Sequence, residues 1–258
     1  MDLALSGRRV LITGGSKGIG LACAKAFVAE GAQVAIVSRD AANLEAARAQ
    51  LPGLWTAAAN LIDPAAAAAV VNRVEHELGP LDILVNSAGA AQRTPPDDLT
   101  PAAWRAAMDA KYFTYIHVLD PVVKRMAARK AGVVVNIIGS GGKVASPSHL
   151  PGGAANAALM LATVGLAHAY ATHGLRILAI NPGLTQTTRV AEGLRAEAKR
   201  LGVTEADALK ATIDKIPMGR LAEADEIASM TVFAASGKAS YLSGVVITMD
   251  GVSAPIVV

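Results

Sequence analysis

The stretch V-L-I-T-G-G-S-K-G-I-G, residues 10–20, decides the fold of this chain. The apolar run before the glycines predicts a β-strand, and the glycines open an Ala-rich helical stretch. Glycines let the backbone turn tightly and approach a phosphate group, while the N-terminus of the following helix offers free N–H groups and a positive dipole end. A strand, a glycine turn and a helix in this order therefore predict a dinucleotide-binding site.

Apolar runs alternate with Ala-rich helical stretches along the rest of the chain. Strands that are apolar on both faces and separated by helices indicate a parallel sheet covered on both sides. We therefore predict one doubly wound Rossmann domain of the α/β class over residues 1–258, with about seven strands. The predicted strands are residues 9–12, 33–37, 54–58, 83–86, 133–138, 176–180 and 245–249, and the helical stretches start near Gly18, Ala41, Pro64, Pro101, Pro151 and Ala222.

Composition excludes several classes of protein. With 52% hydrophobic residues the chain can fill a core, and a net charge of +3 with 3% aromatic residues argues against a nucleic-acid partner. Cys23 is the single cysteine, so no intrachain disulfide forms, which fits a cytoplasmic protein. The Ala-rich stretch at 153–167 contains Asn156 and Thr163 and predicts a buried helix rather than a membrane span. We expect no membrane partner.

The end of the second predicted strand indicates which dinucleotide binds. NAD-binding proteins place an acidic residue there for the ribose 2′-hydroxyl, whereas this chain has Ser38 and Arg39. A hydroxyl and a guanidinium suit a 2′-phosphate, which Arg grips with two hydrogen bonds. Lys17, inside the glycine loop, adds a second cation. The alternative is that both cations only face solvent, but the pattern favours NADP(H).

The chain resembles the short-chain dehydrogenase/reductase family along nearly its whole length. Residues 13–20 are similar to that family's cofactor loop, and residues 86–89 (N-S-A-G) to its N-N-A-G element, which stabilises the sheet and lies by the adenosine ribose. Residues 60–61 stand beside the adenine in that family, and residues 182–187 resemble its P-G-x-x-x-T segment, which faces the nicotinamide. The cofactor-binding residues that the motifs and the resemblance together imply are Gly14, Ser16, Lys17, Gly18, Ile19, Gly20, Ser38, Arg39, Asn60, Leu61, Asn86, Ala88, Gly89, Pro182, Gly183, Thr185 and Thr187.

The chain departs from the family at three of its four catalytic positions. The family uses an Asn, a Ser and a Tyr-x-x-x-Lys pair, and only Ser140 matches this set. Gly152 and Asn156 stand at the Tyr and Lys positions, and Lys111, seven residues after Trp104, stands at the Asn position. The family's main proton donor is absent, and its Asn and Lys have exchanged places.

Four residues are the candidate catalytic set: Ser140, His149, Lys111 and Asn156. Ser140 is expected to donate a hydrogen bond to a substrate oxygen. His149 lies three residues before Gly152, and because an imidazole titrates near neutral pH it is the preferred proton donor or acceptor. In the fold that the resemblance implies, Lys111 would return the missing positive charge from the opposite side of the site. The alternatives are that His149 and Lys111 face water and Asn156 satisfies a helix carbonyl.

The leading function is an NADPH-dependent carbonyl reductase or, in reverse, an alcohol dehydrogenase, acting on a small-molecule substrate. A lyase, isomerase or cyclase on the same scaffold, and a non-catalytic NADP(H)-binding protein, remain open. No spacing of His, Cys and Asp suggests a metal site. Residues 185–216 are expected to form a helical lid over the substrate cleft. The resemblance also implies a homodimer or homotetramer.

Overall fold

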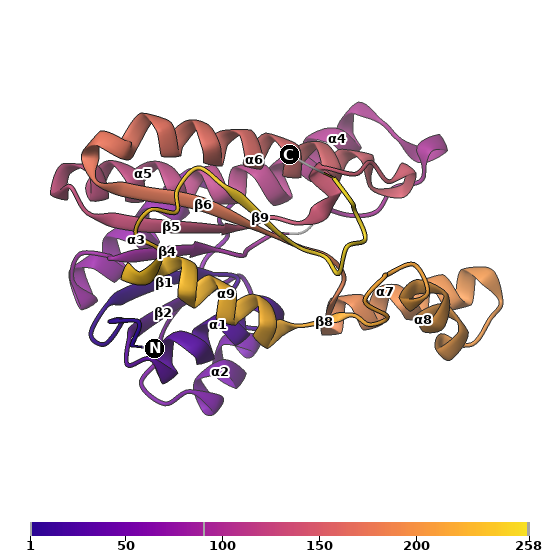
Figure 1. Ribbon diagram of the computed structural model, residues 1–258, viewed down its shortest axis with the longest axis horizontal. Coiled ribbons are helices and arrows are strands. Elements are labelled where there is room, and N and C mark those ends of the chain that lie inside the picture. Colours follow the sequence, from indigo (N-terminus) through magenta and orange to yellow (C-terminus); the bar gives the residue numbers. More distant parts are fainter. Residues whose placement is uncertain (1, 90, 257–258) are drawn as a thin grey trace.

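The computed structural model describes residues 2–89 and 91–256. Its central sheet has seven parallel strands in the order β3-β2-β1-β4-β5-β6-β9 (Figure 1). The sequence prediction of a doubly wound parallel sheet is therefore confirmed. The strands are β1 (Arg9–Thr13), β2 (Gln33–Ser38), β3 (Trp55–Ala58), β4 (Ile83–Asn86), β5 (Gly132–Ile137), β6 (Leu175–Pro182) and β9 (Val246–Met249).

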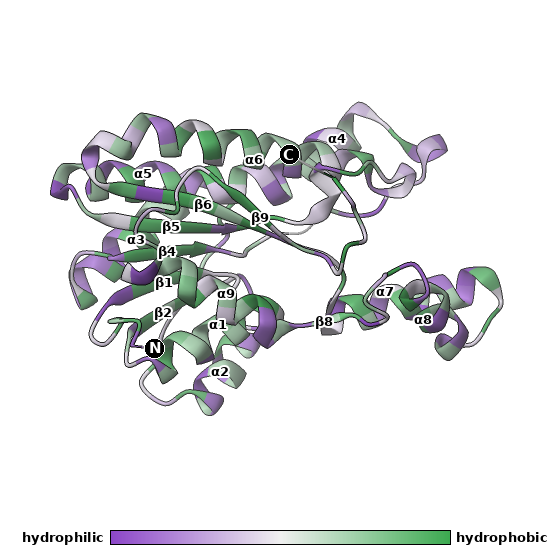
Figure 2. Ribbon diagram, in the orientation of Figure 1, coloured by the Kyte–Doolittle hydropathy of each residue, from purple (hydrophilic) through white to green (hydrophobic). Residues whose placement is uncertain are grey.

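Helices cover both faces of the sheet, so alternate residues of one strand enter different cores. The helices are α1 (Gly18–Ala29), α2 (Ala41–Gln50) and α9 (Ala224–Ala235) on one face, and α3 (Pro64–Leu78), α5 (Thr114–Arg129) and α6 (Leu150–Tyr170) on the other. Leu11 packs into the core beneath α3, α5 and α6, whereas its neighbour Ile12 packs into the core beneath α1, α2 and α9. Both residues have no exposed surface, and Figure 2 shows that the strands are predominantly apolar.

Local sequence sets where several of these helices begin. The Asp63 carboxylate accepts a hydrogen bond from the Ala65 backbone N–H at 2.8 Å, and Pro64 occupies the first helical position of α3. Thr100 caps α4 (Pro101–Ala107) in the same way, its Oγ1 accepting from the Ala103 N–H at 3.2 Å. The sequence predicts both helix starts because a cap and a proline act through local geometry alone.

The helix predicted from Pro101 onward is interrupted. After α4 the backbone winds more widely in a π-helical segment, Met108–Phe113, before α5 begins at Thr114. A π-helical turn inserts an extra residue and rotates the side chains that follow, and such turns are frequent at functional sites. Lys111 lies within this segment and is turned into the protein.

The predicted lid, residues 185–216, contains two helices. They are α7 (Thr188–Leu201) and α8 (Glu205–Ile213), and they extend to one side of the sheet (Figure 1). Two short parallel strands hold their base, β7 (Thr185–Gln186) and β8 (Ala222–Glu223), which the sequence did not reveal. Each helix buries a single residue, so its polar residues mostly face solvent. Closure over the cleft stays a prediction.

Helix α6 is long and apolar enough to cross a membrane by composition alone, counting its flanking turns from 147 to 173. In this fold it lies against the sheet instead, and eight of its residues, including Asn156 and Thr163, are buried there. A core helix passes the same composition test. This placement agrees with the buried helix expected from the sequence.

A chain of buried polar side chains ties the carboxyl ends of three strands to α6. Thr13 Oγ1 donates to Asn86 Oδ1 at 3.2 Å, and Asn86 Nδ2 donates to Asn136 Oδ1 at 3.0 Å. Asn136 Nδ2 donates to Thr163 Oγ1 at 3.0 Å, and Thr163 donates to the Leu159 carbonyl at 2.7 Å. All four polar residues are essentially inaccessible to water. Every link is therefore costly to remove, because the partner would remain buried without a hydrogen bond.

Replacing Asn136 with leucine should lower the free energy of unfolding by about 1–3 kcal/mol, because Asn86 and Thr163 each lose a buried partner. Urea unfolding followed by circular dichroism measures this change. Asn43→Leu is the matched control, since the Asn43 side chain forms no hydrogen bond within the described part of the chain. A loss no larger in Asn136→Leu than in the control would contradict a structural role for this chain of hydrogen bonds.

Candidate active site

The glycine loop after β1 leaves its backbone open to a ligand. Gly14 has φ +67°, and a Cβ there would lie 2.8 Å from the Ala88 Cα, so only glycine fits between the two loops. Lys17 is the N-cap of α1, and its side chain makes no capping hydrogen bond. The first-turn N–H groups of α1 therefore face the loop without a side-chain acceptor. This arrangement suits a phosphate group.

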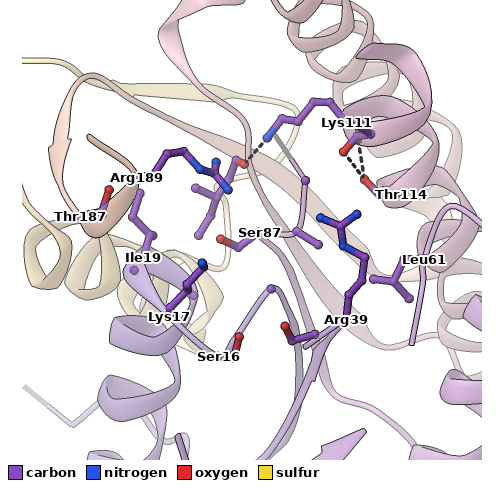
Figure 3. Close-up of a pocket in the computed structure, with 18 of the residues that line it drawn as sticks. Ser16, Lys17, Ile19, Arg39, Leu61, Ser87, Lys111, Thr114, Thr187 and Arg189 are labelled. Atoms are coloured by element: carbon purple, nitrogen blue, oxygen red, sulfur yellow. Dashed lines mark hydrogen bonds between the residues drawn. The ribbon is translucent and has the colours of Figure 1, made fainter. Parts of the chain in front are cut away.

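A cavity of about 320 Å³ lies at the carboxyl ends of the strands, between the glycine loop and the start of α7 (Figure 3). Fourteen predicted cofactor residues line it: Gly14, Ser16, Lys17, Gly18, Ile19, Gly20, Ser38, Arg39, Leu61, Ala88, Gly89, Pro182, Gly183 and Thr187. Arg189, which the family resemblance places in a loop at the border of the substrate cleft, also lines the cavity. Sequence reasoning missed ten further lining residues: Val37, Ala59, Ile62, Ser87, Ala110, Thr114, Ile137, Ile138, Gly139 and Thr188. Most of these follow a strand end, and that position is the signal that could have identified them.

Three predicted cofactor residues lie outside the cavity lining. Asn86 is fully buried in the polar chain described above, so it supports the loop beside the cavity rather than reaching into it. Asn60 is exposed, and its Oδ1 accepts from the Ile62 N–H at 3.3 Å. Thr185 is buried, and its hydroxyl donates to the Gly183 carbonyl at 3.2 Å. The side chains of Asn86, Asn60 and Thr185 therefore form hydrogen bonds within the chain, where the sequence predicts contacts with the cofactor.

The cavity is strongly cationic. Lys17, Arg39, Lys111 and Arg189 line it, and no aspartate or glutamate does so among the described residues. None of the four cations forms an ion pair within residues 2–89 and 91–256. Uncompensated positive charge in a concave site attracts anionic ligands.

Lys111 is the most unusual of these cations because it is almost wholly buried, with 7% of its surface exposed. Its Nζ donates to Tyr115 Oη at 2.9 Å and to the Ile137 carbonyl at 3.3 Å. Burial, with a smaller contribution from the positive charge of Arg189, lowers the pKa of Lys111 to about 7. The side chain enters the cavity from the π-helical segment (Figure 3). The alternative that Lys111 faces solvent is therefore wrong.

Tyr115 supports Lys111 from one helical turn further along. Its hydroxyl donates to the same Ile137 carbonyl, and the residue has no exposed surface. Burial raises the pKa of Tyr115 far above its ordinary value, so the phenol stays protonated. Tyr115 does not line the cavity, and its role here is to hold the ammonium in place.

Ser140 begins a short turn directly after β5. The preceding Gly139 has φ +136°, and its N–H donates to Asn181 Oδ1 at 3.0 Å, which fixes the turn to β6. The Ser140 hydroxyl is half-buried and forms no hydrogen bond with any described residue. It is therefore available to a ligand.

The ring of His149 fills the space that a side chain at position 152 would occupy. A Cβ built on Gly152 would overlap the imidazole and lie 2.8 Å from its Nδ1. Gly141 contacts the same ring, because a Cβ there would lie 3.4 Å from His149 Cδ2. The Nδ1 atom is buried without a hydrogen-bond partner among the described residues. His149 is thus packed inward rather than facing water as a loop histidine.

Burial lowers the pKa of His149, and the positive charges of Arg93 and Lys111 lower that pKa further. The imidazole is consequently neutral at neutral pH. A neutral imidazole can accept a proton from a bound alcohol.

Asn156 lies on the same face of α6, one turn after Gly152. It is buried, its Nδ2 faces the turn formed by Gly139 and Gly141, and its Oδ1 has no partner among the described residues. Buried polar atoms are nearly always hydrogen-bonded, so an unsatisfied amide oxygen indicates a ligand or water contact. The alternative was that the Asn156 side chain donates a hydrogen bond to a helix carbonyl. The described residues contain no such hydrogen bond.

The rest of the described chain offers little other chemistry. No group of three His, Cys, Asp or Glu residues within 2–89 and 91–256 is placed to hold a metal ion. Cys23 is buried, and burial raises the pKa of its thiol to about 12, so it is unreactive.

Several known proteins are similar to this chain over most of its length. The family model described as short chain dehydrogenase matches residues 8–199. Gluconate 5-dehydrogenase of Gluconobacter oxydans is 31% identical over 252 residues, covering 96% of this chain and 95% of that protein. L-xylulose reductase of Bos taurus is 31% identical over 252 residues, covering 97% and 98%. The crystal structure of L-sorbose reductase from Gluconobacter frateurii, complexed with NADPH and L-sorbose, has a TM-score of 0.94 and 28% identity and covers 100% of both chains.

The buried Lys111 should make folding depend on pH. Its pKa is about 7 in the folded protein and 10.5 ordinarily, so between these values the unfolded chain holds a proton that the folded chain lacks. The free energy of unfolding should therefore rise with pH by up to about 1.4 kcal/mol per pH unit in this window. Lys111→Met should remove that rise and stabilise the protein near pH 7.

Urea unfolding at several pH values from neutral to alkaline measures both effects. Lys25→Met is the control, because Lys25 is exposed on α1. If the slope of Lys111→Met matched that of the control, Lys111 would be charged in the folded protein throughout this range.

Proposed function

This chain belongs to the short-chain dehydrogenase/reductase family, as its sequence predicts, and we propose that it is an NADP(H)-dependent oxidoreductase with a non-standard catalytic set. In this proposal it reduces a small carbonyl compound or oxidises the corresponding secondary alcohol. One observation carries the proposal: the imidazole of His149 occupies the space of a Cβ at position 152, the position at which the family has its tyrosine. This contact supports His149 as the titratable group of the site.

The cavity fits NADP(H). Gly14 and Gly18, both with positive φ, keep the loop free of side chains, and the N-terminus of α1 offers N–H groups to the pyrophosphate. Arg39 and Lys17 would hold the 2′-phosphate. When bound, the nicotinamide donates or accepts the hydride. The NADPH of the sorbose reductase complex supports this cofactor.

The chain's own residues handle the substrate oxygen and its proton. The free hydroxyl of Ser140 donates a hydrogen bond to the carbonyl oxygen and stabilises its developing negative charge. His149 accepts the alcohol proton during oxidation, for which its neutral imidazole is already in the required state, and returns that proton during reduction. Lys111 supplies positive charge beside the same oxygen, and Asn156 Oδ1 accepts a hydrogen bond from the ligand or from a bound water.

The pKa of His149 lies below 6.5, so the two directions should depend on pH in opposite ways. Oxidation requires the neutral ring and should rise to a plateau as pH increases through that pKa, whereas reduction requires the protonated ring and should fall. Lys111, with a pKa of about 7, adds a second and separate inflection.

We also propose that the chain forms a homodimer or homotetramer through the outer faces of α5 and α6. An apolar groove of about 360 Å³ runs between these helices, and Leu161 beside it is 76% exposed. Exposed apolar surface of this kind is typical of an interface.

Arg39→Ala should raise the dissociation constant of NADPH by about 10- to 100-fold, because a charge-assisted hydrogen-bonded pair with the 2′-phosphate is lost. Binding of NADH should stay unchanged. Fluorescence titration with each cofactor measures the two constants, and Arg48→Ala on α2 is the control. A parallel loss of both affinities would show that Arg39 supports the site as a whole and does not read the phosphate.

His149→Ala should lower kcat by about 10²- to 10⁴-fold, the usual contribution of a general acid or base. Gly152→Ala should cause a similar loss, because its Cβ displaces the imidazole. In the His149→Ala background the same Gly152→Ala change should cost little more, since no ring remains to be displaced. NADPH oxidation by a panel of small ketones and keto-sugars measures these rates, with His76→Ala, exposed on α3, as the control.

Full activity of His149→Ala would remove His149 from the mechanism. Additive losses in the double variant would mean that Gly152 acts by another route. If product forms without net consumption of NADPH, the chain is a lyase, isomerase or cyclase. If NADPH binds tightly but no substrate turns over, the chain is a binding protein.

A further inference from the structure

Two cations, Lys111 and Arg189, line the cavity with no carboxylate among its described lining residues to neutralise them. Arg189, at the start of α7, extends into the cavity towards Lys111 (Figure 3). The two charges are close enough for Arg189 to lower the pKa of Lys111. Neither forms an ion pair within the described chain. Like charges brought together in a partly buried site destabilise the protein unless an anion binds between them.

The residues proposed to hold the cofactor phosphates lie at other strand ends than Lys111. The glycine loop, Lys17 and Arg39 lie at the ends of β1 and β2, whereas Lys111 is bonded to the carbonyl of Ile137, at the end of β5, two residues before Gly139 and three before Ser140. Lys111 therefore lies on the side of the Ser140 turn, and Arg189 extends towards it from the start of α7 (Figure 3).

A third cation stands at the outer edge of this region. Arg93 Nη1 donates to Ser148 Oγ at 3.4 Å, next to His149, and its charge also lowers the pKa of His149. Arg93 lies near α7 as well, since it lowers the pKa of Glu197 on that helix. Arg93 thus lies between the turn that carries His149 and helix α7, on which Arg189 stands.

We propose that the substrate of this enzyme is an anionic carbonyl compound, carrying a carboxylate or a phosphate that binds between Arg189 and Lys111. The proposal rests on the proposed function and specifies its substrate class. The anion neutralises the two facing cations and thereby holds the carbonyl beside Ser140 and His149. Arg93 draws the anion towards the cavity from solvent.

A dead-end complex tests the proposal without turnover. With the site saturated by NADP⁺, a ketone can bind but cannot be reduced, so calorimetry reports its affinity alone. The probes are 4-oxopentanoate and its methyl ester, which share a carbonyl and differ in charge, together with dihydroxyacetone phosphate and dihydroxyacetone. We expect each anion to bind at least about tenfold more tightly than its neutral partner, as a charge-assisted contact requires.

Arg189→Met should reduce this preference to about twofold or less, and Arg189→Lys should retain part of it. Arg195→Met is the matched control, because Arg195 lies on the same helix and faces Glu205 at 3.9 Å. Equal binding of charged and neutral probes by the unsubstituted enzyme would overturn the proposal. So would a preference that survives Arg189→Met.

Measuring the affinity for NADPH tests a second explanation, that Arg189 binds the cofactor and not the substrate. If Arg189→Met raises the dissociation constant of NADPH about tenfold and leaves the anion preference intact, Arg189 serves the cofactor and the proposal is wrong. Failure of the proposed function gives a different result, because ketones would then show no NADPH oxidation while the binding preference could still be measured.

Discussion

The buried hydrogen bonds from Thr13 through Asn86 and Asn136 to Thr163 fix the glycine loop, the Ser140 turn and helix α6 relative to one another. They join β1, β4, β5 and α6 at the end of the sheet where the ligand-binding loops emerge. The glycine loop follows β1, the Ser140 turn follows β5, and Gly152 and Asn156 lie on α6. Apolar packing alone tolerates small sliding movements, whereas a continuous set of directional bonds admits only one register. The distances between catalytic groups depend on that register.

Local chemistry made much of the fold predictable. The strand–glycine–helix unit, the proline starts of α3 and α4, and the strand β4 all depend on short-range steric and hydrogen-bonding rules, and the structure places them as predicted. The π-helical segment could not be predicted, because its widened turn follows from packing the Lys111 and Tyr115 side chains against a carbonyl of β5. The pair β7 and β8 is equally a product of distant segments meeting.

The sequence predicted the parts of the site that would contact a ligand through the backbone of a motif. It predicted less well the positions of the individual side chains that line the site. Fourteen of the seventeen predicted cofactor residues line the cavity. Asn86 does not, and its side chain instead forms a buried hydrogen bond between strands β4 and β5. The family resemblance places Arg189 at the border of the cleft, but only the geometry shows that it extends towards Lys111. The burial of Lys111 and the inward packing of His149 depend on neighbours far along the chain. For that reason the sequence alone could not decide whether Lys111 and His149 point into the site or face solvent.

The contact between His149 and Gly152 has a consequence for the history of such a site. Because the imidazole and any larger side chain at 152 compete for one volume, a tyrosine cannot return there by a single replacement without colliding with the ring. A tyrosine introduced at position 152 would have to displace the imidazole, and a change made first at position 149 would leave neither proton carrier in place. Sterics therefore make the histidine and the tyrosine mutually exclusive occupants of this part of the site.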